Sequence, residues 1–201
     1  MARRLLSSEQ PRIAVLLSGG GRSLENLAEC VERGELAVNL ALVIASRPDA
    51  FGLTRAERLG LARLVLDPAR ELSPEAFSHE VFAAVEAAGC SLVVLAGFLR
   101  FLPIPRAWEG RVINIHPSLL PAFGGKGCYG RRVHAAVLER GVEFTGCTVH
   151  YADNEYDHGQ ILLQRCVPVL QEDDEESLAA RVFEEEKLAL PEAIRRHLAR
   201  D

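Results

Sequence analysis

Short runs of apolar residues alternate along most of the chain with segments whose apolar positions recur at helical spacing. The runs predict strands at Arg12–Leu17, Leu36–Ala45, Ala62–Leu66, Ser91–Ala96 and Arg111–Ile115, and the spaced segments predict helices at Ser23–Arg33, Gly52–Leu59 and Pro74–Ala88. Apolar strands that alternate with helices are typical of a parallel sheet covered on both faces. The pattern therefore predicts an α/β fold with a mostly parallel central sheet.

The pattern changes in the last third of the chain. Glu143–Tyr151 and Gln160–Val169 are extended runs separated by a polar, turn-forming segment, which predicts an antiparallel C-terminal addition to the sheet. Glu175–Leu198 predicts a closing amphipathic helix with a break at Pro191. Without a repeat or linker, we expect one domain over residues 11–201 behind a flexible N-terminal tail at residues 1–10.

The composition fits an ordinary globular protein, with 48% hydrophobic and 25% charged residues in 201. No apolar run approaches the roughly 18 residues of a membrane helix, and the start of the chain lacks the apolar core of a signal peptide. A net charge of -5 disfavours general binding of nucleic acid, which needs a basic face. We therefore expect a cytoplasmic protein that acts on small molecules, with no nucleic-acid or membrane partner; the sequence does not indicate an oligomeric state.

The five cysteines are odd in number and scattered. No Cys-x-x-Cys pair or zinc-finger spacing of Cys and His occurs. They are interpreted as reduced structural thiols, and no metal is expected.

A glycine-rich turn, Ser18–Ser23, follows the first predicted strand and opens the first predicted helix. Its sequence, Ser-Gly-Gly-Gly-Arg-Ser, can leave helix N-terminal amides facing an anion; the alternative is that the three glycines serve only a tight turn. It matches neither the dinucleotide fingerprint nor the P-loop. The second predicted strand ends near Arg47 rather than at an acidic residue, so phosphate is favoured over a dinucleotide.

Candidate chemistry lies at the end of the fifth predicted strand. Asn114 and His116 are two residues apart, so both side chains lie on one face. An amide donor and an imidazole could stabilise an oxyanion and move a proton, as acyl transfer to an amine requires. The alternative is a satisfied histidine and a local backbone cap. Downstream, Asp157 either orients the imidazole and raises its pKa or is solvated like Asp153 and Glu155.

Ordered motifs resemble those of the phosphoribosylglycinamide formyltransferase family, which catalyses the folate-dependent third step of purine synthesis. They are Asn114-Ile-His-Pro-Ser-Leu-Leu-Pro121, Val149-His150, Asp157-x-Gly159, Ser18-Gly19, Asp49–Leu53 and Leu95–Arg100. The resemblance covers nearly the whole chain and implies a Rossmann-like formyltransferase fold. It also implies that 10-formyltetrahydrofolate donates a formyl group to the amine of 5-phosphoribosylglycinamide, with no metal.

The same resemblance implies a role for individual residues. Asn114 would stabilise the oxyanion, and His116, held charged by Asp157, would supply a proton. Glu186 would contact the ribosyl substrate. The phosphate loop would comprise Gly20, Gly21, Arg22, Ser23, Leu24 and Glu25, and the folate site Leu99, Arg100, Phe101, Leu102 and Asn114.

Three departures from the family pattern stand out. Arg22 takes a place in the glycine turn where the family often has a small polar residue, and we expect it to contact phosphate. Pro74 replaces an arginine associated with the folate tail, so that contact is either absent or made by Arg70. The loop 122–130 is long and glycine-rich: it is either a mobile flap or an ordered variant with Lys126 near phosphate, and His134 in the following helix is interpreted as structural.

Other functions on the same fold remain as alternatives. A methionyl-tRNA formyltransferase and a formyltetrahydrofolate deformylase share the motif but are expected to carry a further domain, for which this sequence leaves little room. A formyltetrahydrofolate-dependent enzyme with another acceptor, or a non-catalytic nucleotide-binding module, would need a test of activity to exclude.

Overall fold

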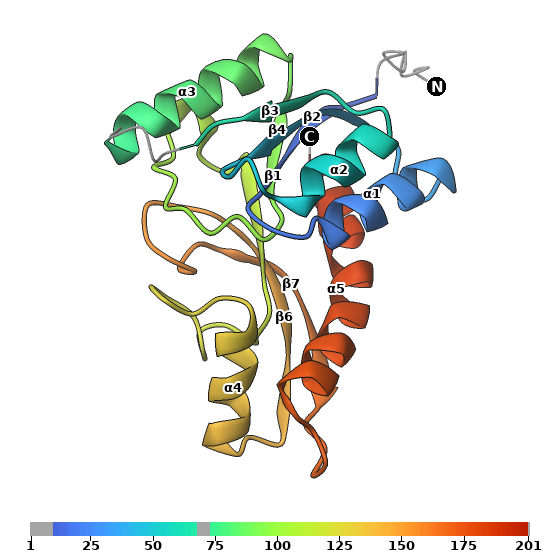
Figure 1. Ribbon diagram of the computed structural model, residues 1–201, viewed down its shortest axis with the longest axis vertical. Helices are drawn as coiled ribbons and strands as arrows, with labels where there is room; N and C mark the ends of the chain where they lie inside the picture. The colour runs from blue at the N-terminus through green and yellow to red at the C-terminus, as the bar shows by residue number, and fades with distance from the viewer. Residues whose placement is uncertain (1–9, 68–72, 201) are drawn as a thin grey trace, which may run out of the picture.

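The computed structural model describes residues 10–67 and 73–200, and one sheet of seven strands runs through this part of the chain (Figure 1). The strands are β1 (Arg12–Leu17), β2 (Asn39–Ala45), β3 (Arg63–Val65), β4 (Leu92–Leu95), β5 (Val112–His116), β6 (Phe144–Tyr151) and β7 (Ile161–Pro168), in the order β3-β2-β1-β4-β5-β6-β7. The first five pair in parallel, and β6 and β7 join antiparallel. The predicted parallel sheet with an antiparallel addition is confirmed.

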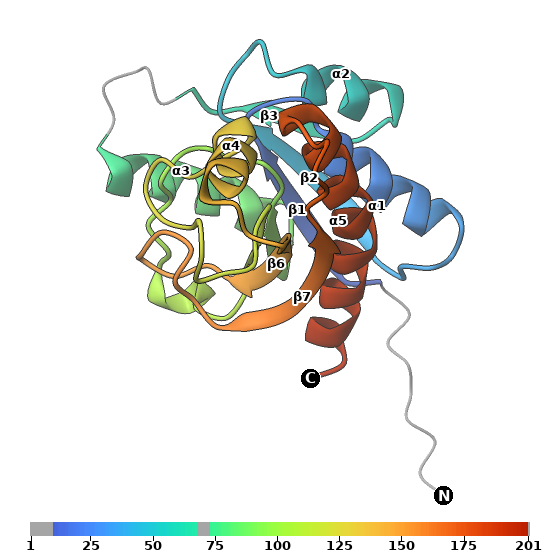
Figure 2. The same ribbon diagram turned by 90° about the horizontal axis from the view of Figure 1, so that it is seen from below.

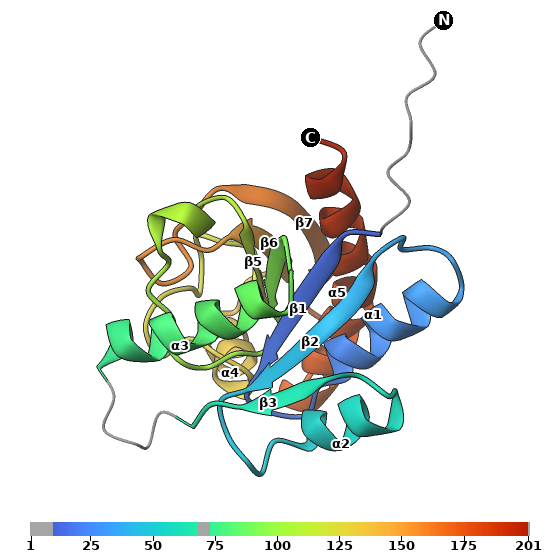
Figure 3. The same ribbon diagram turned by 90° about the horizontal axis from the view of Figure 1, so that it is seen from above.

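Helices cover both faces of this sheet (Figure 3). Four of them, α1 (Arg22–Glu32), α2 (Phe51–Arg58), α4 (Arg131–Arg140) and α5 (Glu175–Leu198), pack into one core cluster. On the opposite face, α3 (Pro74–Ala87) and a short 3₁₀ helix, η1 (Arg106–Trp108), pack into a second cluster. Figure 2 shows α5 alongside α1 and the curved β6–β7 pair, which places this helix beside both parts of the sheet.

Alternation along β1 divides its side chains between the two cores. Ile13, Val15 and Leu17 enter the cluster of α1 and α5, whereas Ala14 and Leu16 enter that of α3. All five are fully buried. Burial of both faces explains why the strand has a continuous apolar sequence rather than an alternating one.

The predicted break at Pro191 is wrong, because α5 continues through this residue to Leu198. Proline has no N–H to donate to the carbonyl four residues earlier, which leaves the Lys187 oxygen without its helical partner. The Asn26 side chain on α1 donates to that oxygen at 3.0 Å. A neighbouring helix thus satisfies the group that proline orphans, and the helix can pass through it.

Another difference concerns the start of the second strand, and some predictions fall on residues that the structure does not describe. The second strand begins at Asn39 rather than Leu36, because the amides of Leu36 and Val38 bond to the carbonyls of Cys30 and Leu36 in the turn after α1. The predicted tail at residues 1–10, apart from Gln10, lies outside the described residues, and so does Arg70.

Candidate active site

A cleft of about 460 Å³ opens at the carboxyl ends of β1, β4 and β5. The chain leaves β1 toward β2 on one side and later returns to β4 on the other, so loops diverge here and leave a crevice. The glycine turn, the segment after β4, the end of β5 and one face of α5 all line it.

The glycine turn forms one wall of the cleft. Gly21 caps α1 with a φ of 72°, and no side chain caps the helix, so the first-turn amides lack a side-chain acceptor. A Cβ on Gly21 would lie 2.6 Å from the Gly52 Cα, so the turn can pack on α2 only as glycine. Gly52 N–H donates to the Gly19 oxygen, and Arg55 donates to the Gly20 oxygen. The geometry can accept an anion at a helix N-terminus.

The structure places the predicted phosphate residues unequally. Gly20, Gly21, Arg22 and Ser23 line the cleft. Leu24 is fully buried in the core and does not line the cleft, so the structure does not place this predicted phosphate residue at the ligand surface. The Glu25 carboxylate forms an ion pair with Arg55, which also donates to the Gly20 oxygen, so Glu25 stabilises the turn rather than lining the cleft.

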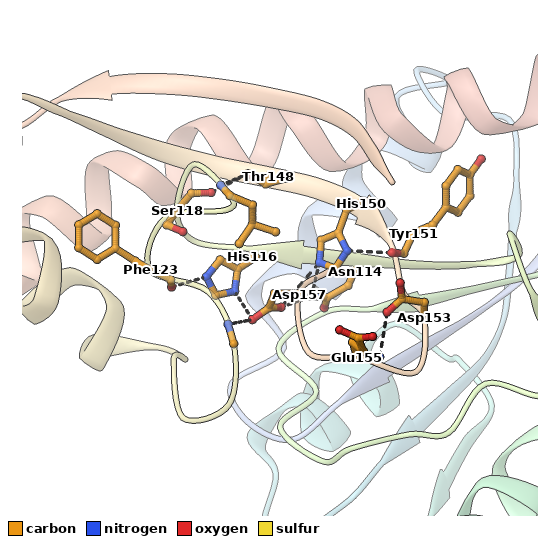
Figure 4. Close-up of polar contacts among 12 residues, drawn as sticks. Asn114, His116, Ser118, Phe123, Thr148, His150, Tyr151, Asp153, Glu155 and Asp157 are labelled. Carbon is orange, nitrogen blue, oxygen red and sulfur yellow. Dashed lines mark hydrogen bonds and ion pairs between the residues drawn. The ribbon is translucent and has the colours of Figure 1, made fainter. Parts of the chain in front are cut away.

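The strand β5 brings its two polar residues against β6 (Figure 4). In the antiparallel register Asn114 lies opposite His150, and His116 lies opposite Thr148. His116 and His150 are 3% and 2% exposed, whereas Asn114 is half-buried at the cleft wall. Asp157, in the loop after β6, points between the two histidines and Asn114 (Figure 4).

Hydrogen bonds fix the tautomer of His150 and the orientation of Asn114. The Tyr151 carbonyl can only accept, so His150 Nδ1 donates to it at 2.8 Å. With the proton on Nδ1, the ring accepts at Nε2 from the Asn114 amide at 3.0 Å. The second Asn114 N–H faces Asp157 Oδ1 at 3.4 Å, a long contact that an incoming oxygen could replace.

His116 lies between two acceptors. Its Nε2 donates to the Phe123 carbonyl at 2.9 Å, and its Nδ1 is 3.4 Å from Asp157 Oδ2. Burial lowers the pKa of His116 below its ordinary value, while Asp157 and the Phe123 carbonyl oppose that shift. Asp157 thus acts to raise the pKa of His116, as the hypothesis expected, but burial lowers this pKa by more.

Asp157 is itself tightly held. It has a φ of 53°, unusual for a residue with a side chain, and its Oδ2 accepts from the Gly125 N–H at 2.9 Å. Burial acts to raise the pKa of Asp157, but contacts with His150, His116 and Gly125 together hold it below its usual value. The carboxylate is thus ionised, with its charge directed at His116.

The loop 122–130 packs against these catalytic candidates. Phe123 and Gly125 supply the backbone groups that bond His116 and Asp157. A Cβ on Gly124 would lie 2.4 Å from Leu120 Cδ2 and 3.2 Å from Asp157 Cβ. Lys126 is exposed and does not line the cleft in the part of the chain described, so the alternative that places it near phosphate finds no support.

The predicted folate segment lines the cleft after β4. Ser18 Oγ, bonded to Ser46, accepts from the Leu99 N–H at 2.9 Å and ties this segment to β1. Leu102 is buried, whereas Leu99 is 48% exposed. The Phe101 ring lies 5.0 Å from that of Tyr156. These residues give the cleft an apolar wall, which suits a flat aromatic ligand.

Several cleft residues were not predicted as site residues. His150 belongs to the Val149-His150 motif, which was the signal in the sequence, and the strand register places it opposite Asn114. Phe183 and Arg131 line the cleft from α5 and α4.

His134, interpreted from sequence as structural, also reaches the cleft wall. It is 4% exposed, and its Nδ1 has no hydrogen-bond partner among the described residues. Burial lowers the pKa of His134.

Glu186 lies on the α5 wall of the cleft, as predicted. Burial raises the pKa of Glu186 to about 7, and the charge of Arg22 opposes this shift. Its carboxyl can therefore change protonation near neutral pH.

Within residues 10–67 and 73–200, no group of three or more His, Cys, Asp or Glu residues could hold a metal ion, and no helix is long and apolar enough to cross a membrane. The five cysteines are all free. Metal-free chemistry stays a prediction.

Comparison with known proteins identifies related chains. Residues 11–194 match the formyl transferase family model. A solved structure of glycinamide ribonucleotide transformylase 1 from Symbiobacterium toebii superposes with a TM-score of 0.88 at 40% identity, covering 96% of this chain and 90% of that one. Phosphoribosylglycinamide formyltransferase, chloroplastic, of Arabidopsis thaliana is 39% identical over 94% of this chain. The trifunctional purine biosynthetic protein adenosine-3 of Drosophila melanogaster is 38% identical over 96% of it. The chain spans 66% and 14% of the length of these two relatives, respectively.

Proposed function

Because this chain belongs to the phosphoribosylglycinamide formyltransferase family of formyl transferases, we propose that it transfers the formyl group of 10-formyltetrahydrofolate to the amine of 5-phosphoribosylglycinamide. This reaction is the third step of de novo purine synthesis. The observation that carries the proposal is the contact of Asn114, His116 and Asp157 in a cleft that also holds an open helix N-terminus.

The three central residues take different parts in this reaction. The Asn114 N–H that faces Asp157 at 3.4 Å turns to the formyl oxygen as negative charge develops there. His116 in its charged form stabilises the same oxygen and supplies a proton to the departing folate nitrogen, and the proton that the attacking amine loses restores the charged imidazole. Asp157 offsets the cost of charging this buried imidazole, since its carboxylate faces Nδ1.

The two substrates approach from opposite walls of the cleft. The acceptor phosphate binds the amides of Gly20–Ser23 together with the Arg22 side chain, and Glu186 contacts the ribosyl group. The folate binds along Leu99–Leu102. This arrangement points the acceptor amine and the formyl carbon toward Asn114, where both reactants must meet.

Steady-state turnover of 10-formyltetrahydrofolate with 5-phosphoribosylglycinamide tests the proposal. We expect turnover by the wild-type protein and a loss of about 10²-fold or more in His116→Ala. His79→Ala, which removes an exposed histidine on α3, serves as the control and should retain full turnover. A folded wild-type protein without activity would exclude the enzyme, and full activity in His116→Ala would exclude the mechanism.

The same assay separates the alternatives. Hydrolysis of the folate without an acceptor would indicate a deformylase, and transfer only to another amine would indicate a different acceptor. Binding of both substrates with no reaction would indicate a non-catalytic module. We also propose that the protein works in the cytoplasm on small molecules alone; plant relatives named as chloroplastic make location worth testing by fractionation.

A further inference from the structure

An aromatic ring on α5 lies against the only arginine of the glycine turn. The Arg22 guanidinium carbon is 3.6 Å from the centre of the Phe183 ring, and both residues line the cleft. Lys187, one helical turn further along α5, is 5.9 Å from the same ring. None of the steps proposed above requires an aromatic side chain at this place.

The stacked guanidinium keeps its hydrogen-bonding capacity. Over residues 10–67 and 73–200, the Arg22 side chain makes no hydrogen bond or ion pair, whereas the nearby Arg55 is bound to Glu25 and to the Gly20 carbonyl. Guanidinium N–H groups lie in the plane of the group, so a ring packed on its face leaves them free. Arg22 is thus oriented but not neutralised.

The same face of α5 carries Glu186, three residues after Phe183. No ion pair joins Glu186 to Arg22 in the described part of the chain, although the Arg22 charge opposes the rise in the pKa of Glu186 to about 7. A carboxyl that is partly protonated near neutral pH leaves positive charge at Arg22 for a ligand. A phosphate monoester, with two negative charges and three acceptor oxygens, is the matching chemistry.

We propose that Phe183 is a positioning residue of the acceptor site: its ring holds the Arg22 guanidinium at the mouth of the glycine turn, where the in-plane N–H groups meet a phosphate monoester. The inference rests on the proposed function and adds to it a residue that selects phosphorylated acceptors. An unsupported arginine at the exposed start of α1 would lose more side-chain entropy on binding, so the ring raises affinity by holding Arg22 in place.

Phe183→Leu tests this role because it keeps apolar bulk and removes the aromatic face. We expect the KM for 5-phosphoribosylglycinamide to rise about 3- to 10-fold, as for the loss of a partly exposed cation–π contact, with kcat and the folate KM within about twofold. The dephosphorylated acceptor, glycinamide riboside, should show no change. Phe183→Tyr should restore the wild-type KM, and Leu188→Ala, an exposed position elsewhere on α5, serves as the matched control.

A double-mutant cycle with Arg22→Ala shows whether the ring acts through the arginine. If it does, Phe183→Leu will have little further effect on the KM once Arg22 is absent. An unchanged KM in Phe183→Leu, an equal effect on both acceptors, or an equal effect in the Arg22→Ala background would each overturn the proposal.

Binding of inorganic phosphate, measured by calorimetry on the whole protein, separates this inference from the proposed function. Phosphate should bind the wild type and bind Phe183→Leu about 3- to 10-fold more weakly, with no difference in the Arg22→Ala background. If phosphate binds in this way but the protein transfers no formyl group, the proposed reaction is refuted while the role of Phe183 in phosphate binding remains supported. Equal phosphate affinity in wild type and Phe183→Leu, or no binding to the wild type, would refute the role of Phe183.

Discussion

Replacing Asp157 by asparagine removes one negative charge from the centre of the cleft while keeping the shape of the side chain. In the wild-type protein, Oδ2 accepts from Gly125 at 2.9 Å and faces His116 Nδ1 at 3.4 Å, while Oδ1 faces Asn114 at 3.4 Å. An amide cannot accept at both ends, so one NH₂ hydrogen must face a donor. The substitution therefore disturbs both charge and hydrogen bonding.

The distance to His116 sets the scale of the effect. Opposite charges 3.4 Å apart attract by about 5 kcal/mol at an effective dielectric constant of about 20, which is an upper bound on what the carboxylate contributes to the imidazolium. Relaxation and water recover part of it, so we expect kcat to fall about 10²- to 10³-fold, with either KM changing less than about threefold.

The pH profile gives a second measure. Burial already lowers the pKa of His116, and Asp157 opposes that shift, so removal of the carboxylate lowers this pKa further. If the reaction needs protonated His116, the fall in kcat with rising pH will begin at lower pH in the variant. Stopped-flow or steady-state assays across pH 5–9 would show this, with Asp153→Asn in the same loop as a control expected to keep full kcat. A normal kcat with weakened binding, or an unmoved pH profile, would refute the assigned role.

Three further substitutions test the site and the fold. Gly124→Ala places a Cβ 3.2 Å from Asp157 Cβ, so kcat should fall about tenfold or more in a protein that still melts cooperatively; an unchanged kcat would mean that Asp157 can move freely. Glu186→Gln should flatten the pH dependence of the free energy of unfolding. Because burial raises the folded pKa of Glu186 to about 7 from 4.5, this carboxyl stabilises the wild type fully below pH 4.5, and up to about 3 kcal/mol of that stabilisation is lost as pH rises through 7. Urea unfolding of the wild type and the variant at pH 5 and 8 would detect or exclude this loss. Gly146→Ala puts a Cβ 1.9 Å from the Arg165 carbonyl oxygen between β6 and β7, so the free energy of unfolding should drop by about 2 kcal/mol or more; wild-type stability would contradict this register.

The parallel half of the fold could be predicted because its strands are buried on both faces. Continuous apolar runs such as β1 and β4 have few other interpretations in a chain of this length. The break at Pro191 was mispredicted for a local reason, since the partner that satisfies the orphaned carbonyl comes from Asn26, far away in sequence. A local sequence pattern shows which hydrogen bonds neighbouring residues can make, but it does not show a donor that a distant helix brings by packing.

The candidate site divides in the same way. Asn114 and His116 belong to one strand, so their common face follows from alternation alone. Asp157 comes from a loop that folds back, and the motif rather than the pattern suggested it. The Phe123 carbonyl and the Phe183 ring could not be predicted, because a backbone group and an apolar side chain gain their roles only from where the chain places them.

The bond from Asn26 to the Lys187 carbonyl has an evolutionary consequence. Pro191 and Asn26 complement each other: proline at 191 leaves a carbonyl that needs a donor, and the Asn26 amide supplies one. Sequences of relatives should therefore show the two positions changing together, with proline at 191 seldom found beside an apolar residue at 26. Because the pair joins the helix of the glycine turn to the helix of Phe183 and Glu186, drift at either position would also shift the acceptor site.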